Sequence, residues 1–335
     1  MNKSCLIGFL MCSAFSLVVQ AATDGAHITK TISQIERKKG IKRTIQYRPD
    51  GNDFVCVNGK NRYTRALYGG ITDFRIETSD RPVFATYKPK DSKHICFRLQ
   101  CGNQSIALDS LKFCEARYRA GRRTYRLTDP LLGKGELNIS VLAFPDAEGG
   151  IWRFTMKDMP EGALLHCYIS EIRAKNLSRN GDMGADRADS FDAPQLPKEQ
   201  KHYKLSLDGT TAYIVVEDQE LRLPALVEGT SLYDKSEKWR SEIESSLQIS
   251  TPDPYFNPLG GALAAAADGI WDGKIWLHGA IGWRSQLNGW RAAYIGDFIG
   301  WHDRARTHFD SYAASQVTDV PATIPHPTQD TALHL

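Results

Sequence analysis

The sequence predicts a multidomain fold in which an antiparallel β-sandwich is followed by a helical segment. Between residues 42 and about 230, short segments rich in β-branched and aromatic residues alternate with Gly, Pro, Asn and Asp. Many short strands separated by turns favour a sandwich. After Leu232 the spacing of apolar residues becomes helical, and residues 262–267 form an alanine-rich run that strongly favours helix.

The first 21 residues predict a secretory signal peptide. Lys3 gives the segment a positive start, and an apolar run from Cys5 to Val19 follows. Val19 and Ala21 supply the small residues that a signal peptidase recognises. We therefore expect a periplasmic or secreted protein whose mature chain begins at residue 22 and has no membrane anchor after cleavage.

The β-sandwich domain is predicted over residues 22–230. Turn-type dipeptides at Asn58–Gly59, Gly149–Gly150 and Asp208–Gly209 predict hairpins within it. The expected strands are Arg43–Tyr47, Phe54–Val57, Val83–Tyr87, His94–Leu99, Leu137–Phe144, Ile151–Met156, Ala163–Ile169 and Ala212–Val216.

A helical linker is expected over residues 231–258. It holds a charged helical pattern from Tyr233 to Leu247, which Pro252 and Pro254 interrupt. The next domain, predicted over 259–335, opens with a helix at Leu259–Trp271.

A long helical pattern then runs from Gly289 to about Gln316. Gly296 and Gly300 lower its intrinsic helix propensity, and such glycines often mark places where helices pack closely.

The charge of the chain is nearly balanced. Its formal net charge is +3 at pH 7, which gives no argument for binding nucleic acid or an anionic membrane. One basic cluster comprises Arg117, Arg119, Arg122, Arg123 and Arg126. These arginines fit solvated strand faces and turns, and the alternative is contact with an acidic polysaccharide. No pattern indicates an oligomeric state.

The sequence predicts no cofactor. Five cysteines remain after signal cleavage, and either disulfides, such as Cys96–Cys101, or buried free thiols fit their positions. No CxxC pair indicates a zinc site. A loop-like segment at 178–200 offers four aspartates that could hold calcium, although their spacing differs from that of an EF-hand. They are Asp182, Asp186, Asp189 and Asp192.

The candidate functional site lies in the stretch from Trp271 to Arg306, which holds five of the seven tryptophans. At 100° per residue, one helix face would carry Trp290, Tyr294, Asp297, Trp301 and His308. Aromatic rings beside charged groups suit a sugar, which is apolar on its faces and polar at its edges. The opposite interpretation is an aromatic core stripe whose carboxylate pairs with an arginine.

Under the sugar-site interpretation Asp297 is the candidate catalytic acid or base. The candidate substrate-binding residues are Asp272, His278, Trp283, Arg284, Asn288, Trp290, Arg291, Tyr294 and Trp301. The sequence has no glycine-rich phosphate loop, no GxSxG motif and no HExxH motif.

Three runs of residues resemble the opening of an (α/α)6 domain of six-hairpin, α-L-rhamnosidase-like glycosidases. They are DPYFNPLGGALAAAADGIWDG from Asp253, HGAIGWR from His278 and NGWRAAYIGDFIGWHDRAR from Asn288. FVCVNGKNRYTRALYGG, from Phe54, is similar to a domain of unknown function that precedes such glycosidase domains.

The resemblance implies hydrolysis of a polysaccharide or oligosaccharide by paired carboxylates, commonly with inversion. The carboxyl groups of an inverting pair stand about 6.5–9.5 Å apart. The chain has room for only part of such a helical ring. We therefore expect an N-terminal fragment of a longer enzyme, with at least one catalytic carboxylate beyond Leu335.

Two functions follow from these patterns. The first is an exported glycoside hydrolase of the six-hairpin type. The second is a non-catalytic β-sandwich module that binds carbohydrate or supports the helical domain structurally.

Overall fold

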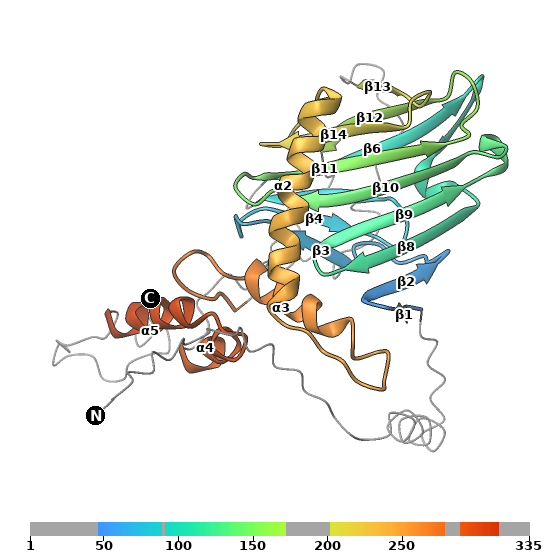
Figure 1. Cartoon of the computed structure of the whole chain (residues 1–335). Helices are drawn as coiled ribbons and strands as arrows, with labels where there is room; N and C mark the ends of the chain where they lie inside the picture. Colours follow the sequence, from blue (N-terminus) through green and yellow to red (C-terminus); the bar gives the residue numbers. More distant parts are fainter. Residues whose placement is uncertain (1–45, 89–90, 172–201, 279–288, 315–335) are drawn as a thin grey trace, which may run out of the picture.

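The computed structural model describes residues 46–88, 91–171, 202–278 and 289–314. Antiparallel sheets dominate its N-terminal part and face each other like the layers of a sandwich, and a few helices follow (Figure 1). This confirms the predicted β-sandwich in outline. The predicted signal peptide and the aspartate-rich segment lie outside the described residues.

The first sheet has eight strands in the order β1-β2-β8-β9-β10-β11-β14-β15, and all neighbours are antiparallel. Its strands are β1 (Arg48–Asp50), β2 (Asp53–Val57), β8 (Phe113–Arg119), β9 (Arg122–Thr128), β10 (Glu136–Ala143), β11 (Gly149–Lys157), β14 (Thr211–Glu217) and β15 (Glu220–Arg222).

The second sheet has seven strands in the order β13-β12-β6-β5-β4-β3, with β7 paired to the long β6. Its strands are β3 (Arg65–Tyr68), β4 (Arg75–Thr78), β5 (Phe84–Lys88), β6 (Asp91–Cys101), β7 (Gln104–Ala107), β12 (Leu164–Glu171) and β13 (Tyr203–Ser206). Two short 3-10 helices, η1 (Leu108–Ser110) and η2 (Pro130–Leu132), lie in connections between strands.

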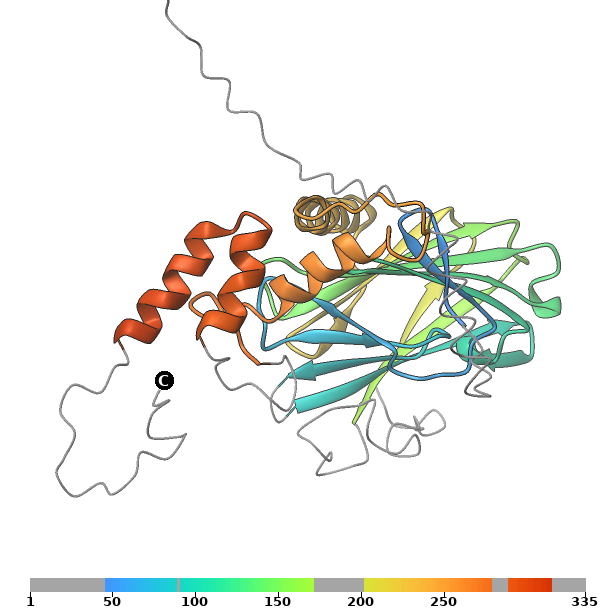
Figure 2. The ribbon, with the colours of Figure 1, turned by 90° about the horizontal axis from the view of Figure 1, so that it is seen from below.

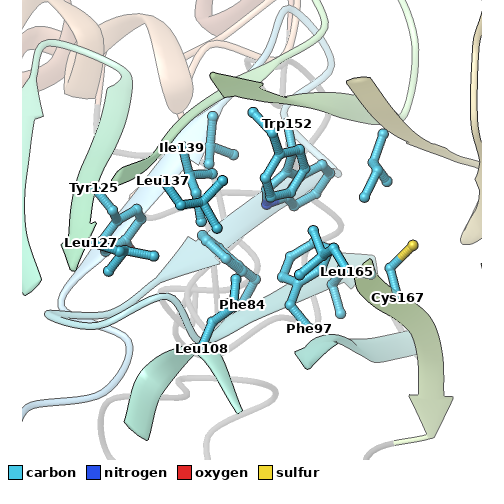
Figure 3. Packing of buried hydrophobic residues seen from close by; sticks show 14 of the residues in the cluster. Phe84, Phe97, Leu108, Tyr125, Leu127, Leu137, Ile139, Trp152, Leu165 and Cys167 are labelled. Carbon is cyan, nitrogen blue, oxygen red and sulfur yellow. The ribbon is translucent and has the colours of Figure 1, made fainter. Parts of the chain in front are cut away.

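The main hydrophobic core fills the space between the two sheets (Figure 3). Trp152 on β11 is fully buried there. Its ring lies 5.7 Å from that of Phe84 on the opposite sheet, at an interplanar angle of 85°. Phe97 packs edge-on against Phe84 at 5.7 Å. Such edge-to-face pairs add to the stabilisation that burial alone provides.

Strand alternation separates the core side of the eight-stranded sheet from its outer side. In β9 the side chains of Tyr125 and Leu127 join the core. The intervening Arg122, Thr124 and Arg126 are partly exposed on the other face. Most of the basic cluster therefore lies partly exposed on the outer strand face, except that Arg123 is fully buried.

Helix α2 (Leu226–Ser245) lies across the outer face of the eight-stranded sheet (Figure 1). Tyr233 of α2 packs there in a second hydrophobic cluster with residues of β10, β11 and β14. Three further helices follow: α3 (Leu259–Gly269), α4 (Gly289–Phe298) and α5 (His302–Ala314). Figure 2 shows α4 and α5 side by side at one end of the sandwich. No helix among the described residues is long and apolar enough to cross a membrane.

The predicted hairpin positions were wrong. Gly149 and Gly150 lie inside β11, paired with β10 and β14, and the turn precedes them. A side chain at Gly150 would collide with Ile76 of the facing sheet. Asn58–Gly59 and Asp208–Gly209 connect strands that do not pair with each other. Gly150 thus marks close packing between the sheets, whereas Gly59 and Gly209 lie where the chain crosses from one sheet to the other.

The continuous helix predicted from Gly289 was also wrong, because α4 ends at Phe298. Gly300 has a φ of +87°. The amide of Gly300 donates to Asp297 O at 3.1 Å and that of Trp301 donates to Gly296 O at 2.7 Å. This pair of hydrogen bonds is a Schellman motif, which ends helices at a left-handed glycine.

All five cysteines beyond the predicted signal peptide are free thiols. Cys96 and Cys101 both lie on β6. They are five positions apart, so strand alternation directs them to opposite faces of the sheet. The free-thiol alternative therefore describes this structure.

Candidate functional site

A tryptophan cluster connects α3 with the α4–α5 pair. It comprises Trp271, Trp276 and Trp301. Trp276 is fully buried, and its indole N–H donates to Ala267 O at 3.1 Å. The Trp271 and Trp276 rings lie 4.6 Å apart, and Trp301 packs against the same group. The cluster is the hydrophobic core of the helical segment.

Two residues hold the helices onto Trp276. A side chain at Gly296 of α4 would overlap the Trp276 ring, so only glycine permits this approach. On α5, the buried His308 accepts the Trp276 backbone N–H through Nδ1 at 3.1 Å. The prediction that Gly296 marks close packing is confirmed, while Gly300 instead ends the helix.

A partly buried ion pair borders the tryptophan cluster. Arg304 of α5 donates to Asp268 Oδ1, at the end of α3, at 2.7 Å. The guanidinium carbon of Arg304 lies 4.4 Å from the ring centroid of Trp301 and 5.7 Å from that of Trp271. The cation is therefore held between two aromatic faces and a carboxylate.

The pKa of Asp268 is raised by burial, and the hydrogen bond from Arg304 opposes the shift. The sequence patterns did not single out Asp268 or its partner Arg304. The available signal was a single acidic residue directly after the alanine-rich run, a position where an acid needs a partner once it is buried.

Asp297, the candidate catalytic residue, points to the opposite, solvent side of α4. Its side chain is 70% exposed and its Oδ1 lies 2.7 Å from His302 Nδ1. Tyr294, one turn earlier, is 65% exposed. The structure thus brings Tyr294, Asp297 and His302 to one open surface, which we call the α4 surface.

Trp301 lies apart from the α4 surface. Because the chain turns at Gly300, the Trp301 ring packs against Ala293, Ala305 and Trp276. The expected single face with Trp290, Tyr294, Asp297 and Trp301 therefore divides, since Tyr294 and Asp297 face solvent.

The other predicted substrate-binding residues are placed as follows. Asp272 is exposed and caps a turn by accepting the Lys274 and Ile275 amides at 2.9 and 2.7 Å. His278 is exposed at the end of the same segment. Trp283, Arg284 and Asn288 lie outside the described residues. The backbone of Trp290 and Arg291 is in α4, and their side chains are outside the description.

The helical segment is joined tightly to the sandwich. Gly269, at the end of α3, lies directly against the Tyr68 ring of β3, where any Cβ would overlap it. The Thr72 hydroxyl donates to Gly269 O at 2.6 Å and is buried. The candidate site is thus supported by strands far away in the sequence.

A second set of contacts joins α2 to the β8–β9 turn. Glu244 accepts from Arg119 Nε at 2.8 Å and from Arg240 at 2.8 Å. Burial opposes ionisation, but the hydrogen bonds from these two arginines outweigh it and lower the pKa of Glu244. Arg122 pairs in the same way with Glu237 at 2.8 Å.

No group of three or more histidine, cysteine or acidic side chains among the described residues is arranged to hold a metal ion. The chemistry that the α4 surface offers is acid–base chemistry at a carboxylate–imidazole pair beside an exposed phenol ring.

Comparison with known proteins agrees with the β-rich part. Residues 89–216 match the family described as "Domain of unknown function (DUF4450)". The match extends from β6 into β14 and includes none of the described α-helices. A comparison with curated proteins finds no match. The expected domain of unknown function is therefore supported, and the match makes no connection to glycosidases.

Proposed function

We propose that the protein is an exported glycoside hydrolase in which the sandwich supports a helical, (α/α)6-type catalytic region that begins at α3. The α4 surface supplies one wall of the sugar site. The observation that carries this proposal is the exposed pair Tyr294 and Asp297 on a helix that the tryptophan cluster holds rigidly. A ring for stacking and a carboxylate within one turn suit a polyhydroxylated substrate.

Asp297 serves as the acid or base, and His302 positions it. The 2.7 Å contact with His302 Nδ1 fixes one carboxylate oxygen, while the exposed side chain can still reach a substrate oxygen. Exposed apolar side chains of α4 and α5, Phe298 and Phe309, are the surfaces against which further helices of such a domain would pack.

The sandwich contributes support instead of chemistry in this proposal. Gly269 against Tyr68, and Thr72 on the Gly269 carbonyl, fix the end of α3 where Asp268 begins the cluster. The alternative function is a sandwich that acts as a non-catalytic accessory module. The contacts of Gly269 and Thr72 fit this alternative equally well if the helical region has no activity.

The test measures the release of reducing sugar from a panel of polysaccharides. The wild-type protein, purified from the cells that produce it, is compared with its Asp297→Asn variant. The control is Asp303→Asn, which alters a fully exposed aspartate on α5. We expect Asp297→Asn to lower kcat by about 100-fold or more and Asp303→Asn to leave it unchanged. Equal activity of all three proteins would contradict the role of Asp297, and absence of any turnover would contradict the hydrolase.

A further inference from the structure

The outer face of the eight-stranded sheet holds an open groove of about 350 Å³, which we call the sheet groove. It lies over β8, β9, β10 and β11, beside the part of the sheet that α2 covers. Its polar lining includes Arg117, Arg122, Arg126, Asn138, Arg153 and Thr155.

Strand register brings this lining together in two neighbouring rows. One row runs across the four strands through Arg117, Thr124, Ser140 and Arg153. The adjacent row runs through Glu115, Arg126, Asn138 and Thr155. Residues two apart on a strand share a face, so both rows point outward. At about 4.8 Å between strands, each row is roughly 14 Å long.

Three of the four groove arginines have acidic partners. Arg117 binds Glu115 at 2.9 Å and Asp50 at 2.8 Å. Arg126 lies 3.3 Å from Glu136. Arg122 pairs with Glu237 of α2 as described above. These pairs leave the groove close to neutral, which does not suit a polyanion such as nucleic acid.

Arg153 differs from the other three. Its guanidinium lies 3.8 Å from the Tyr233 ring centroid, and the Tyr233 hydroxyl in turn lies 2.7 Å from Ser140 Oγ. Among the described residues it makes neither a salt bridge nor a hydrogen bond, and its Nε is buried without a partner. An oriented guanidinium with unused donors is suited to a planar carboxylate.

We propose that the sheet groove binds a sugar residue carrying one carboxylate, a uronic acid unit. Arg153 bonds the carboxylate, and the Asn138 amide and the Thr124 and Thr155 hydroxyls bond the sugar hydroxyls. A single unpaired cation matches a single charge, and the surrounding neutral polar groups match a polyhydroxylated ring. This site lies on the sandwich and is independent of the proposed function of the α4 surface.

The test is titration calorimetry of the full chain with an α-1,4-linked galactose tetramer in which one unit is replaced by galacturonate. Its methyl ester, which keeps the sugar and removes the charge, is the matched ligand control. We expect the tetramer to bind and the ester to bind at least about tenfold more weakly, as for loss of a charge-assisted contact. A sulfated galactose tetramer that binds where the galacturonate does not would overturn the carboxylate assignment.

Variants locate the binding. Arg153→Gln should weaken binding of the tetramer by about tenfold or more. Thr155→Glu places a negative charge in the groove at an exposed strand position and should do the same without touching the packing on Tyr233. Arg306→Gln, an exposed arginine on α5, is the control.

Unchanged affinity in Thr155→Glu, or equal losses in Thr155→Glu and Arg306→Gln, would overturn the proposal even if Arg153→Gln fails to fold. None of these variants alters Tyr294 or Asp297. A failure of uronic acid binding at the sheet groove would therefore leave the proposed hydrolytic activity of the α4 surface unaffected.

Discussion

The sandwich and the helical segment use aromatic residues in opposite ways. In the sandwich, Trp152 and its aromatic neighbours are enclosed between two sheets. In the helical segment, Trp276 is equally buried. Tyr294 and Phe298, both on α4, are nevertheless 65% and 66% exposed. The sandwich encloses its own core, whereas the helices hold a small core against the sandwich and present an apolar, acidic surface to the outside.

The helices depend on the sandwich more than the sandwich depends on the helices. The tryptophan cluster is small, and α3 is fixed at Gly269 by Tyr68 and Thr72. The core between the sheets draws on strands of both layers and needs no residue of α4 or α5.

Trp152→Ala is expected to have the largest effect on the stability of the protein. Removing a fully buried indole costs about 3–5 kcal/mol of unfolding free energy, and both regions should be lost together. Chemical denaturation followed by far-UV circular dichroism measures the change. A sandwich that keeps its stability would show that the packing around Trp152 is not its main support.

Trp276→Ala is the matched substitution in the helical segment, since this tryptophan is equally buried. A local cost of about 3 kcal/mol or more should unfold α4 and α5 while the sheets remain. Limited proteolysis should then cut between α3 and α5 and leave a stable β-rich fragment. Loss of the whole fold in a single transition would refute the one-way dependence.

Gly269→Val tests the connection between the regions. A side chain there would collide with Tyr68, which should cost about 1–3 kcal/mol. Hydrogen exchange should increase in α3 and in the tryptophan cluster and stay unchanged in β8–β11. Gly209→Ala, where no atom stands within 4 Å of an added Cβ, is the control and should be nearly neutral.

Glu244→Gln removes a pH-dependent contribution to the contact of α2 with the sandwich. Because the pKa of Glu244 is lowered in the folded state, its contribution is present above its ordinary value of 4.5 and is lost as pH falls through the lowered value. We expect the wild type to be about 1 kcal/mol more stable than the variant at pH 7. The difference should disappear near pH 3, whereas the exposed Glu242→Gln should show no such trend.

The smallest expected effect is a difference in thiol reactivity between buried and partly exposed strand positions. Burial raises the pKa of Cys114 and of Cys167 to about 12. At pH 8 both should react slowly with iodoacetamide, because the thiolate is the nucleophile. Mass spectrometry should find the partly exposed Cys101 labelled first. Labelling of Cys114 at the same rate would show that the sandwich opens locally.

Sequence patterns predicted the elements whose local signals agree with their packing. Seven of the expected strands overlap β2, β5, β6, β10, β11, β12 and β14. The expected linker helix lies within α2 apart from its last residues, since α2 ends at Ser245. Strands β8 and β9 were not among the expected strands, because outward arginines dilute their apolar signal. The alternate residues of β8 and β9 are recognised as core residues only once the facing sheet that buries them is known.

The candidate site was predicted less well, for reasons that are non-local. Helical counting placed Trp301 with Asp297, but one left-handed glycine redirects the chain between them. The Asp268–Arg304 pair spans 36 positions, and no local pattern could connect the two. The close approach of Gly269 to Tyr68 is likewise a consequence of tertiary packing.

Binding of neutral oligosaccharides to the full chain, measured by calorimetry, tests directly whether the α4 surface is a sugar site. Tyr294→Ala is the variant and Phe309→Ala is the control. If the α4 surface is a sugar site, Tyr294→Ala should weaken binding by about fivefold or more, as expected for loss of an aromatic stacking contact. Phe309→Ala should leave the affinity unchanged. Oligosaccharide affinity that is the same in both variants and the wild type would contradict the assignment of carbohydrate chemistry to this helix.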